Sequence, residues 1–552
     1  MTLLSSSSSN RLLSFLLFLL ITTISIYSAE VDIKWTSTST QTYTSPVVDN
    51  STVYSVSASG KLVALAKDTG IRRYSVELGI PVSVTPVLHN QMLYIATDTG
   101  IQAVRKSDGG QKVSYSTQSP VLTQPLVFSD NVLIAITKDG NIHVLDIGDQ
   151  SKIKLIRTIL LPAQSEASAA VYGGRVFVFL TDGRLYSVDP QSGTSVLLID
   201  TGRSIWRSMP AVVNDILYVG ADRYLMAIST TGAINFSKEL GGQLYSPVVS
   251  QDKIFIGSND ENLYALNLFG DILWKFKAGD AVRATPLVIN NTVYIGSNDR
   301  KMYALDISSG VVKWSKSVDD WPSSAVYSNG LVYTSTYNGT TTAISTISCR
   351  VTFPEQNATI FARASLAGQA YADAGVGKVE VRTFPGDFES TSGLAEWSTV
   401  LPIVGASEGQ LTIQCRVADR AGNSEIEPYT EMIYNYVFSE EKLPKINVTA
   451  PKSVTVNSAF TIQFKDAAGK PLTNISVTIE GKKYTVADPT GLFTFIPPRE
   501  GPLTLFIEKP NYQTKTVSIQ VQKSYTVEIV VGFVVLVALI IYFFGFRRGK
   551  WR

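Results

Sequence analysis

The sequence predicts an all-β protein: an eight-bladed β-propeller closed by an N-terminal strand, two β-sandwich modules, and one C-terminal transmembrane helix. Three observations predict this architecture. A unit of about 40 residues recurs between residues 45 and 345. Strand-like segments without that unit occupy residues 347 to 523. An uncharged run of 18 residues, Ile529–Phe546, comes after them and has the length of a helix that crosses a bilayer.

Composition narrows the possible functions before any motif is considered. Hydrophobic residues make up 45% of the chain and charged residues 17%, which indicates a folded protein. Lys and Arg exceed Asp and Glu by 48 − 46 = 2, so no bulk charge favours nucleic acid as a partner. Only two His and two Cys are present, which argues against zinc, iron–sulfur, haem and most histidine-based chemistry. We therefore expect no cofactor.

The N-terminal segment, residues 1–29, is predicted to be a secretory signal peptide. An apolar run of 15 residues, Leu12–Ile26, follows a Ser-rich start that contains Arg11. Small residues, Ser28 and Ala29, come directly after it. This order of a polar start, a short apolar run and a small-residue end is typical of a secretory signal. An uncleaved anchor is the alternative.

The repeated unit predicts the propeller, residues 30–346. Its units begin 37 to 44 residues apart, each at a Pro or Ala. Eight positions after each start lies an aromatic residue in seven of the eight units. The starts are Pro46, Pro86, Pro125, Ala169, Pro210, Pro247, Pro286 and Ala325, and the column reads Tyr54, Tyr94, Leu133, Phe177, Tyr218, Phe255, Tyr294 and Tyr333.

Turn pairs such as Asp139-Gly140 and Asn338-Gly339 follow the column and supply the positive φ of a two-residue hairpin. With the alternating segments around them, each unit comprises about four short strands, the pattern of a propeller blade. The eighth unit lacks its fourth strand. The segment 31–35 before the first unit has that strand's character, so we expect it to complete the last blade and close the ring.

These repeats resemble the pyrroloquinoline-quinone propeller family, whose docking pattern is Ala-x-Asp-x-x-Thr-Gly-x-x-x-Trp. The seventh unit reads Ala304, Asp306, Ser309, Gly310 and Trp314, and the sixth keeps Trp274 with one residue fewer. The resemblance covers 315 residues and is specific for the fold. It implies that Trp35, Trp274 and Trp314 dock one blade on the next and have a structural role.

The same resemblance bears on catalysis. The family's dehydrogenases hold their quinone with an adjacent-cysteine disulfide and calcium ligands, but this propeller contains no Cys. Acidic turn residues such as Asp260 and Asp299 recur at one position of the repeat. This recurrence indicates that they stabilise the hairpin turns and do not converge on a catalytic site. His89 and His143 have no partner pattern. The chain resembles the non-catalytic branch, which includes a scaffold of bacterial outer-membrane assembly, and we expect no catalytic or cofactor-binding residue.

Residues 347–440 resemble the Ig-like modules of prokaryotic surface proteins, through the ending Ala418-Asp419-Arg420-Ala421-Gly422-Asn423. Asp419 and Asn423 are weak candidates for calcium ligands, and an Asx-turn that closes a strand is the alternative. Cys349 and Cys415 are the only cysteines, and an extracellular location favours a disulfide between them. The bond would close a loop of 66 residues, worth roughly 4 kcal/mol.

Residues 441–523 form a second sandwich, which resembles the carboxypeptidase-regulatory-like modules of surface proteins. Segments such as Asp488-Pro489-Thr490-Gly491 supply its turn signals. Residues 525–546 are the predicted transmembrane helix, and the basic tail 547–552 places the C-terminus inside. We expect a single-pass protein of the cell membrane, with its N-terminus and bulk outside. Seven sequons are glycosylation candidates: Asn50, Asn235, Asn290, Asn338, Asn357, Asn447 and Asn474.

The sequence thus predicts a membrane-anchored extracellular scaffold or adhesion protein, whose propeller presents a protein- or glycan-binding surface on a stalk. Two alternatives remain at this point. One is an outward-facing quinoprotein-type dehydrogenase, and the other is a ligand sensor that acts through a partner subunit. The residues around the propeller axis discriminate among them, because calcium-binding carboxylates and amides favour the enzyme and a plain or aromatic surface favours binding.

Overall fold

The computed structural model describes residues 31–523, apart from 207, 362, 404–407, 426, 428 and 438–442. The predicted signal peptide, transmembrane helix and basic tail lie outside the described residues. Within residues 31–523 the structure contains strands and turns, and none of it forms a helix long and apolar enough to cross a membrane. The all-β class predicted from the repeat is therefore confirmed for the described part of the chain.

The repeat region forms eight consecutive four-stranded antiparallel sheets. Sheet 1 comprises β2 (Val47–Val48), β3 (Thr52–Val56), β4 (Lys61–Ala66) and β5 (Arg72–Glu77). Sheet 2 comprises β6 (Val87–His89), β7 (Met92–Thr97), β8 (Gly100–Arg105) and β9 (Lys112–Ser116). Sheet 3 comprises β10 (Leu126–Ser129), β11 (Val132–Ile136), β12 (Ile142–Asp146) and β13 (Lys154–Ile159). Sheet 4 comprises β14 (Ala170–Tyr172), β15 (Arg175–Phe179), β16 (Arg184–Val188) and β17 (Ser195–Asp200).

The second half of the repeat region continues the same order. Sheet 5 comprises β18 (Ala211–Val213), β19 (Ile216–Ala221), β20 (Tyr224–Ser229) and β21 (Ile234–Glu239). Sheet 6 comprises β22 (Val248–Ser250), β23 (Lys253–Gly257), β24 (Asn262–Asn267) and β25 (Ile272–Lys277). Sheet 7 comprises β26 (Leu287–Ile289), β27 (Thr292–Ser297), β28 (Lys301–Asp306) and β29 (Val312–Ser317). Sheet 8 comprises β30 (Val326–Ser328), β31 (Leu331–Ser335), β32 (Thr340–Ser345) and β1 (Ile33–Thr38).

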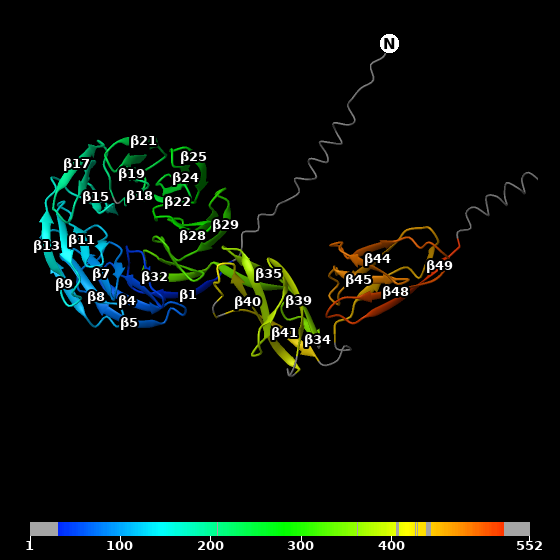
Figure 1. Cartoon of the computed structure of the whole chain (residues 1–552). Coiled ribbons are helices and arrows are strands. Elements are labelled where there is room, and N and C mark those ends of the chain that lie inside the picture. Colours follow the sequence, from blue (N-terminus) through cyan, green and yellow to red (C-terminus); the bar gives the residue numbers. More distant parts are fainter. Residues whose placement is uncertain are drawn as a thin grey trace, which may run out of the picture. The chain divides into compact units, whose positions relative to one another are not determined.

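The N-terminal strand β1 completes the last sheet. It pairs antiparallel with β32, with Thr38 opposite Thr340, so the two ends of the repeat region share one sheet. The sheets follow one another around a ring, and the first strand of sheet 1 contacts the first strand of sheet 8 (Figure 1). This is a propeller-like arrangement in which the predicted joining of the first strand to the last unit is observed.

Hydrophobic clusters hold the ring together. Each pair of neighbouring sheets shares one, and the cluster of Trp35, Val53, Leu65, Tyr333 and their neighbours joins sheet 8 to sheet 1. The second and third strands of the sheets are packed on both faces, which is why β7 is buried along its whole length. Their sequences are accordingly near-continuous apolar runs rather than strict alternations.

Residues after 346 form four more sheets. The first pair consists of β33 (Ile347–Phe353), β34 (Thr359–Phe361), β35 (Arg363–Ala372), β36 (Val376–Thr383), β37 (Glu389–Ser390), β38 (Ser392–Gly393), β39 (Glu396–Pro402), β40 (Gly409–Asp419) and β41 (Thr430–Val437). Their orders are β33-β35-β39-β38 and β34-β41-β40-β36-β37. Cys349 and Cys415 are disulfide-bonded, as the predicted extracellular location favours.

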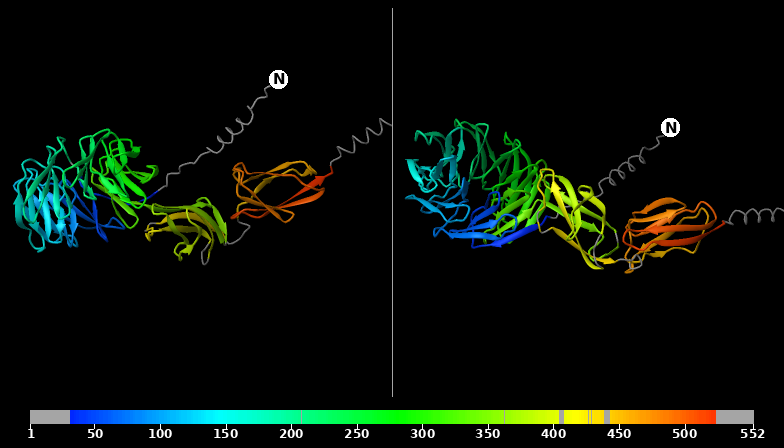
Figure 2. Two further views of the ribbon diagram at one scale, coloured as in Figure 1. Left: turned by 45° about the horizontal axis from the view of Figure 1, so that its top comes forward. Right: turned by 60° about the horizontal axis from the view of Figure 1, so that its bottom comes forward.

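The second pair consists of β42 (Asn447–Thr449), β43 (Ser453–Thr455), β44 (Phe460–Lys465), β45 (Ile475–Ile479), β46 (Lys482–Val486), β47 (Leu492–Phe495), β48 (Gly501–Glu508) and β49 (Lys515–Gln522). The orders are β42-β44-β47 and β43-β49-β48-β45-β46. The sheets lie face to face, coloured orange to red in Figure 2, around a core that includes Phe464, Val477 and Leu505. Alternation of buried and exposed residues along β48 fits a strand with one face in that core.

The chain divides into two compact units. The larger contains the eight sheets together with Ala370–Lys378 and Arg416–Tyr429, and the smaller contains the remaining described residues. The sequence placed the end of the propeller domain at residue 346. The larger unit extends beyond this point because two loops of the following module contribute side chains to it, as described below.

Candidate functional site: an axial cavity and the joints between sheets

A cavity of about 640 Å³ lies at the axis of the ring. Its lining comes from the segments directly before the first strand of every sheet, such as Ser83–Thr85 before β6 and Ser323 and Ser324 before β30. The volume falls in the range of roughly 300–1,000 Å³ that is typical of small-ligand sites. All eight repeats therefore contribute to one shared site, which a single repeat cannot build.

Hydroxyl groups of the lining tie neighbouring sheets together. The residue just before each Pro or Ala start of the repeat is a Ser or Thr in six of the eight units. Four of these hydroxyls accept a hydrogen bond from the backbone N–H at the same position one sheet earlier. The pairs are Ser45 N to Thr85 Oγ1 (3.0 Å), Gln124 N to Ser168 Oγ (3.3 Å), Met209 N to Ser246 Oγ (2.9 Å) and Thr285 N to Ser324 Oγ (2.8 Å).

Two charged side chains line the cavity. The Glu166 carboxylate accepts a hydrogen bond from Trp206 Nε1 at 2.6 Å and lies 3.7 Å from Lys138 Nζ. On the other side, Arg283 Nε and the Tyr245 hydroxyl both donate to Asn259 Oδ1, at 3.0 and 2.9 Å. The side chains thus have fixed orientations, set by neighbours on adjacent loops.

An aromatic rim borders the cavity, formed by Tyr43, Trp321 and Tyr337. The Tyr43 ring, which lines the cavity, meets Tyr337 edge-on at 5.3 Å between centroids, and Tyr337 meets Trp321 at 5.7 Å. Their exposed fractions are 55%, 44% and 38% for Tyr43, Trp321 and Tyr337. Large aromatic side chains usually bury most of their area, so this contiguous exposed group of three is a candidate surface for a ligand or partner.

The tryptophans identified in the sequence, Trp35, Trp274 and Trp314, are buried at the joints, the places where two neighbouring sheets pack together. Trp35 Nε1 donates to Lys67 O of sheet 1 at 2.8 Å, and Trp274 Nε1 donates to Ile307 O of sheet 7 at 3.1 Å. Each indole covers a glycine of the same turn, because a Cβ on Gly70 or Gly310 would lie 2.6 Å from the ring. Other side chains fill this place at other joints, namely Tyr74, Arg157 and Phe236, whereas the backbone oxygen of Leu198 is the nearest atom at Gly232.

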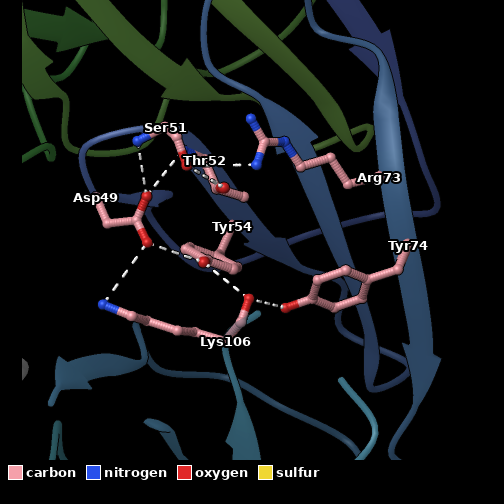
Figure 3. Close-up of polar contacts among 7 residues, drawn as sticks. All are labelled: Asp49, Ser51, Thr52, Tyr54, Arg73, Tyr74 and Lys106. Atoms are coloured by element: carbon pink, nitrogen blue, oxygen red, sulfur yellow. Dashed lines mark hydrogen bonds and ion pairs between the residues drawn. The ribbon is translucent and has the colours of Figure 1, made fainter. Parts of the chain in front are cut away.

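The joint between sheets 1 and 2 shows the polar part of this arrangement (Figure 3). The hydroxyls of Tyr54 and Tyr74 both reach the backbone oxygen of Lys106, at 3.0 and 2.7 Å. Tyr54 also contacts Asp49, whose carboxylate lies 3.8 Å from Lys106 Nζ. Burial raises the pKa of Tyr54 and also that of Tyr74, the latter to about 12, so both hydroxyls stay protonated as donors. Tyr54 belongs to the aromatic column of the repeat, and Tyr74 stands where the docking tryptophan lies in other sheets. Both therefore bind the same carbonyl oxygen of the next sheet.

Sheet 8 has no such turn, because the chain leaves β32 for the next module instead of returning as a fourth strand. The carbonyl at the equivalent position, Thr346 O, accepts a hydrogen bond from the backbone N–H of Asp373 at 3.0 Å. The carboxylate of Asp373, in the turn between β35 and β36, accepts from the docking side chains instead. Trp314 Nε1 donates to Asp373 Oδ2 at 3.3 Å, and the hydroxyls of Tyr294 and Tyr371 donate to the same carboxylate. Burial raises the pKa of Asp373 above its ordinary value, although these donors oppose the shift.

A second loop of that module supplies a buried ion pair. Glu425 is 3% exposed, and its Oε1 lies 2.9 Å from Nζ of Lys34 in β1. Its Oε2 is buried and has no hydrogen-bond partner among the described residues. Burial raises the pKa of Glu425 to about 7, a shift that the nearby Asp32 increases and Lys34 reduces.

The raised pKa predicts that the contribution of Glu425 to the stability of the fold falls as pH rises from about 4.5 to about 7. In that window the folded protein holds a proton on Glu425 that the unfolded chain has lost. We expect the stabilising effect, on the order of 3 kcal/mol, to be complete below pH 4.5 and absent above pH 7. Thermal unfolding of the full chain at pH 5 and pH 8 measures it.

The variant Glu425→Gln should reduce this pH dependence, whereas Glu500→Gln, at an exposed position, should leave it unchanged. The pKa of His143 is lowered by burial, so its contribution has the opposite sign and is lost as pH falls below about 6.5. The comparison between the two variants removes that contribution, because both retain His143. An unchanged slope in Glu425→Gln would contradict the assignment.

The weak metal candidates occupy a turn that satisfies them internally. The Asp419 carboxylate accepts hydrogen bonds from the backbone N–H and the side-chain amide of Asn423, at 2.8 and 2.7 Å. Asn423 Nδ2 also lies 3.2 Å from the Tyr327 hydroxyl. This geometry is that of an Asx-type turn, the alternative named above. Among the described residues, no group of three or more His, Cys, Asp and Glu side chains is arranged to hold a metal ion.

Other residues considered in the sequence also have local partners. His89 Nε2 contacts Asp130 O at 2.9 Å, and His143 Nδ1 contacts the Tyr115 hydroxyl at 3.0 Å. The turn carboxylates Asp260 and Asp299 accept hydrogen bonds from Tyr264 and Tyr303 four residues later in the same hairpin. None of these four lines the axial cavity. All seven sequon asparagines are exposed, as glycosylation requires.

Comparisons with known proteins bear on the repeat region. Among curated proteins, the chain is 26% identical over 251 residues to the outer membrane protein assembly factor BamB of Yersinia pestis. The match covers 40% of this chain, and the chain spans about 60% of the length of that relative. Similar solved structures include BamB from Moraxella catarrhalis, at 20% identity and a TM-score of 0.49, which covers 57% of this chain and 100% of that one. Sqt1 of Saccharomyces cerevisiae has 11% identity and a TM-score of 0.49, with 57% and 98% covered.

A protein-family model agrees with the repeat analysis. The model described as outer membrane protein assembly factor BamB matches residues 23–149, 83–197 and 194–367. Together these matches span residues 23–367, which are 345 of the 552 residues and more than half of the chain. The chain therefore belongs to the family of outer membrane protein assembly factor BamB.

Proposed function

We propose that this protein is a non-enzymatic scaffold whose propeller binds partners through the face that carries the axial cavity and the aromatic rim. In this proposal the eight sheets are the blades of a closed eight-bladed propeller. The two following modules are sandwiches of surface-protein type that act as a stalk. The transmembrane helix at residues 525–546 anchors the protein, with its bulk outside the cell.

One observation carries the proposal: the residues that converge at the axis suit recognition rather than turnover. Among the described residues, the lining contains a single carboxylate, Glu166, which is engaged by Lys138 and Trp206. A quinone–calcium site needs several acidic and amide ligands and an adjacent-cysteine pair, and this lining does not fit that set. The Yersinia relative is named an assembly factor, which supports a role in protein interaction.

Site-specific cross-linking in the source cells tests the proposal. A photoreactive amino acid at Tyr337, on the rim, should capture a reproducible set of neighbours. The same amino acid at Phe269, which is 83% exposed in the turn between β24 and β25, serves as the control. We expect the rim position to enrich its partners at least fivefold over the control position. Equal capture at both positions, or oxidation of a sugar or alcohol by the purified protein, would contradict the scaffold function.

A further inference from the structure

The axial cavity contains a guanidinium group whose end is unused. Arg283 donates through Nε to Asn259, which holds the stem of the side chain in place. Its two terminal nitrogens have no hydrogen bond or ion pair to any residue that the structure describes. A guanidinium that is fixed at Nε and open at the fork presents two parallel N–H donors, the geometry that binds a carboxylate through both oxygens.

The other charge in the cavity is already balanced. Glu166 has the cation of Lys138 at 3.7 Å and the indole N–H of Trp206 at 2.6 Å. Among the lining residues that the structure describes, the uncompensated charge is therefore the positive charge of Arg283. Charge complementarity then favours a ligand with an acidic group over a neutral or cationic one.

The rest of the lining favours a polyhydroxylated ligand. Eight of the eighteen lining residues are Ser or Thr, and the carboxamide of Gln124 adds a donor and an acceptor that no described residue uses. These hydroxyl and amide groups alternate with apolar side chains such as Leu122 and Met209, so the wall offers hydrogen bonds and apolar contacts side by side. It matches the closely spaced hydroxyls of a sugar.

The aromatic rim supplies the apolar contact that such a ligand needs. One face of a pyranose ring consists of C–H groups, and this face packs against the π surface of an exposed aromatic side chain. Tyr43 belongs to both the rim and the cavity wall, while Trp321 and Tyr337 extend the platform outward. Arg283 and Tyr43 line the same cavity, so the ligand needs one ring for the guanidinium and a linked ring for the rim.

We propose that the axial cavity binds an acidic oligosaccharide, with a uronate carboxylate on Arg283 and a neighbouring ring on the aromatic rim. The inference rests on the proposed binding function of this face and names its ligand class. The probe is trigalacturonate, titrated into the full-length protein and followed by calorimetry. Maltotriose, of the same length and without charge, is the matched neutral ligand, and we expect it to bind at least tenfold more weakly.

Two pairs of variants locate the site. Arg283→Gln should weaken trigalacturonate binding at least tenfold, and Trp321→Ala at least fivefold. Their controls are Arg72→Gln, at an exposed position of β5, and Phe269→Ala, and both should bind as the unmodified protein does. All four positions are exposed, so these variants fold, which an unchanged unfolding temperature verifies.

The outcomes separate the ligand class from the function of the face. The proposal that the cavity binds an acidic oligosaccharide is overturned if trigalacturonate shows no saturable binding. It is also overturned if Arg283→Gln binds trigalacturonate as tightly as the unmodified protein does. If cross-links still map to the rim in that case, the scaffold function stands and the occupant is a protein segment. If the rim position captures no partners either, both proposals are contradicted: the acidic oligosaccharide as ligand and the binding function of this face.

Discussion

Replacing Asp373 with alanine is expected to lower the free energy of unfolding by about 4 kcal/mol. The substitution leaves three donors without an acceptor: the hydroxyls of Tyr294 and Tyr371 and the indole N–H of Trp314. Tyr294 and Trp314 are only 1% and 0% exposed, so water does not replace the carboxylate. Each buried donor that loses its partner costs about 1–3 kcal/mol.

The expected loss is measured by urea unfolding of the full chain. Asp373→Asn keeps one carbonyl oxygen and should lose about half as much stability as Asp373→Ala. Asp387→Ala, at an exposed position outside this network, is the matched control and should change stability by less than about 0.5 kcal/mol. If Asp373→Ala behaved like Asp387→Ala, the carboxylate would have no role in joining sheet 7 to sheet 8.

Replacing Trp35 with alanine should have a similar effect at the other side of sheet 8. Trp35 is 8% exposed, donates to Lys67 O, and packs against Tyr333 at 5.8 Å between ring centroids. Truncation of a buried tryptophan costs about 3–5 kcal/mol. Because Trp35 lies in the strand that closes the ring, we also expect the variant to aggregate through the unpaired edge of β32.

Trp321→Ala is the control for this experiment, since Trp321 is 44% exposed and lies in a loop. Its unfolding midpoint should stay within about 2 °C of that of the unmodified protein. The two variants are compared by thermal unfolding and by light scattering during heating. Equal midpoints in the two tryptophan variants would show that the joint of β1 with sheet 1 does not support the ring.

The repeat made most of the larger unit predictable. The aromatic column and the hairpin turns recur in phase with the strands, because each sheet packs against its two neighbours in the same way. The pairing of β1 with β32 was also predictable, since the last unit lacks a strand and residues 31–35 resemble one. Local patterns succeed where the structure is local or periodic.

The tryptophan motif does not identify all of the residues that dock one sheet on the next. Arg157 occupies the place of the tryptophan in sheet 3, although it does not resemble a tryptophan chemically. In sheet 4 the backbone of Leu198 makes the close contact with Gly232. The joint requires close packing over a glycine, so Gly193 and Gly232 carry the better signal. Asp373 could not be found in this way, because it belongs to no repeat and reaches Trp314 from 59 residues later in the chain.

The candidate site was the least predictable part. Arg283, Gln124 and Glu166 lie in loops of different repeats, where length and composition vary. Nothing in their local sequence indicates that they meet at one axis. The hydroxyl residue before each Pro or Ala start was a usable signal, since it recurs in six units and marks the positions that face the cavity.

The position of β1 has a consequence for how the chain folds during synthesis. Its partner β32 ends at Ser345, so β1 leaves the ribosome roughly 300 residues before it has anything to pair with. At about 5–20 residues per second, this interval lasts roughly 15–60 s. A lone strand exposed for so long invites pairing with other chains. The strand Ile-Lys-Trp-Thr-Ser-Thr contains a cation and three hydroxyl residues among its six. These polar residues keep the unpaired strand soluble until β32 has been synthesised.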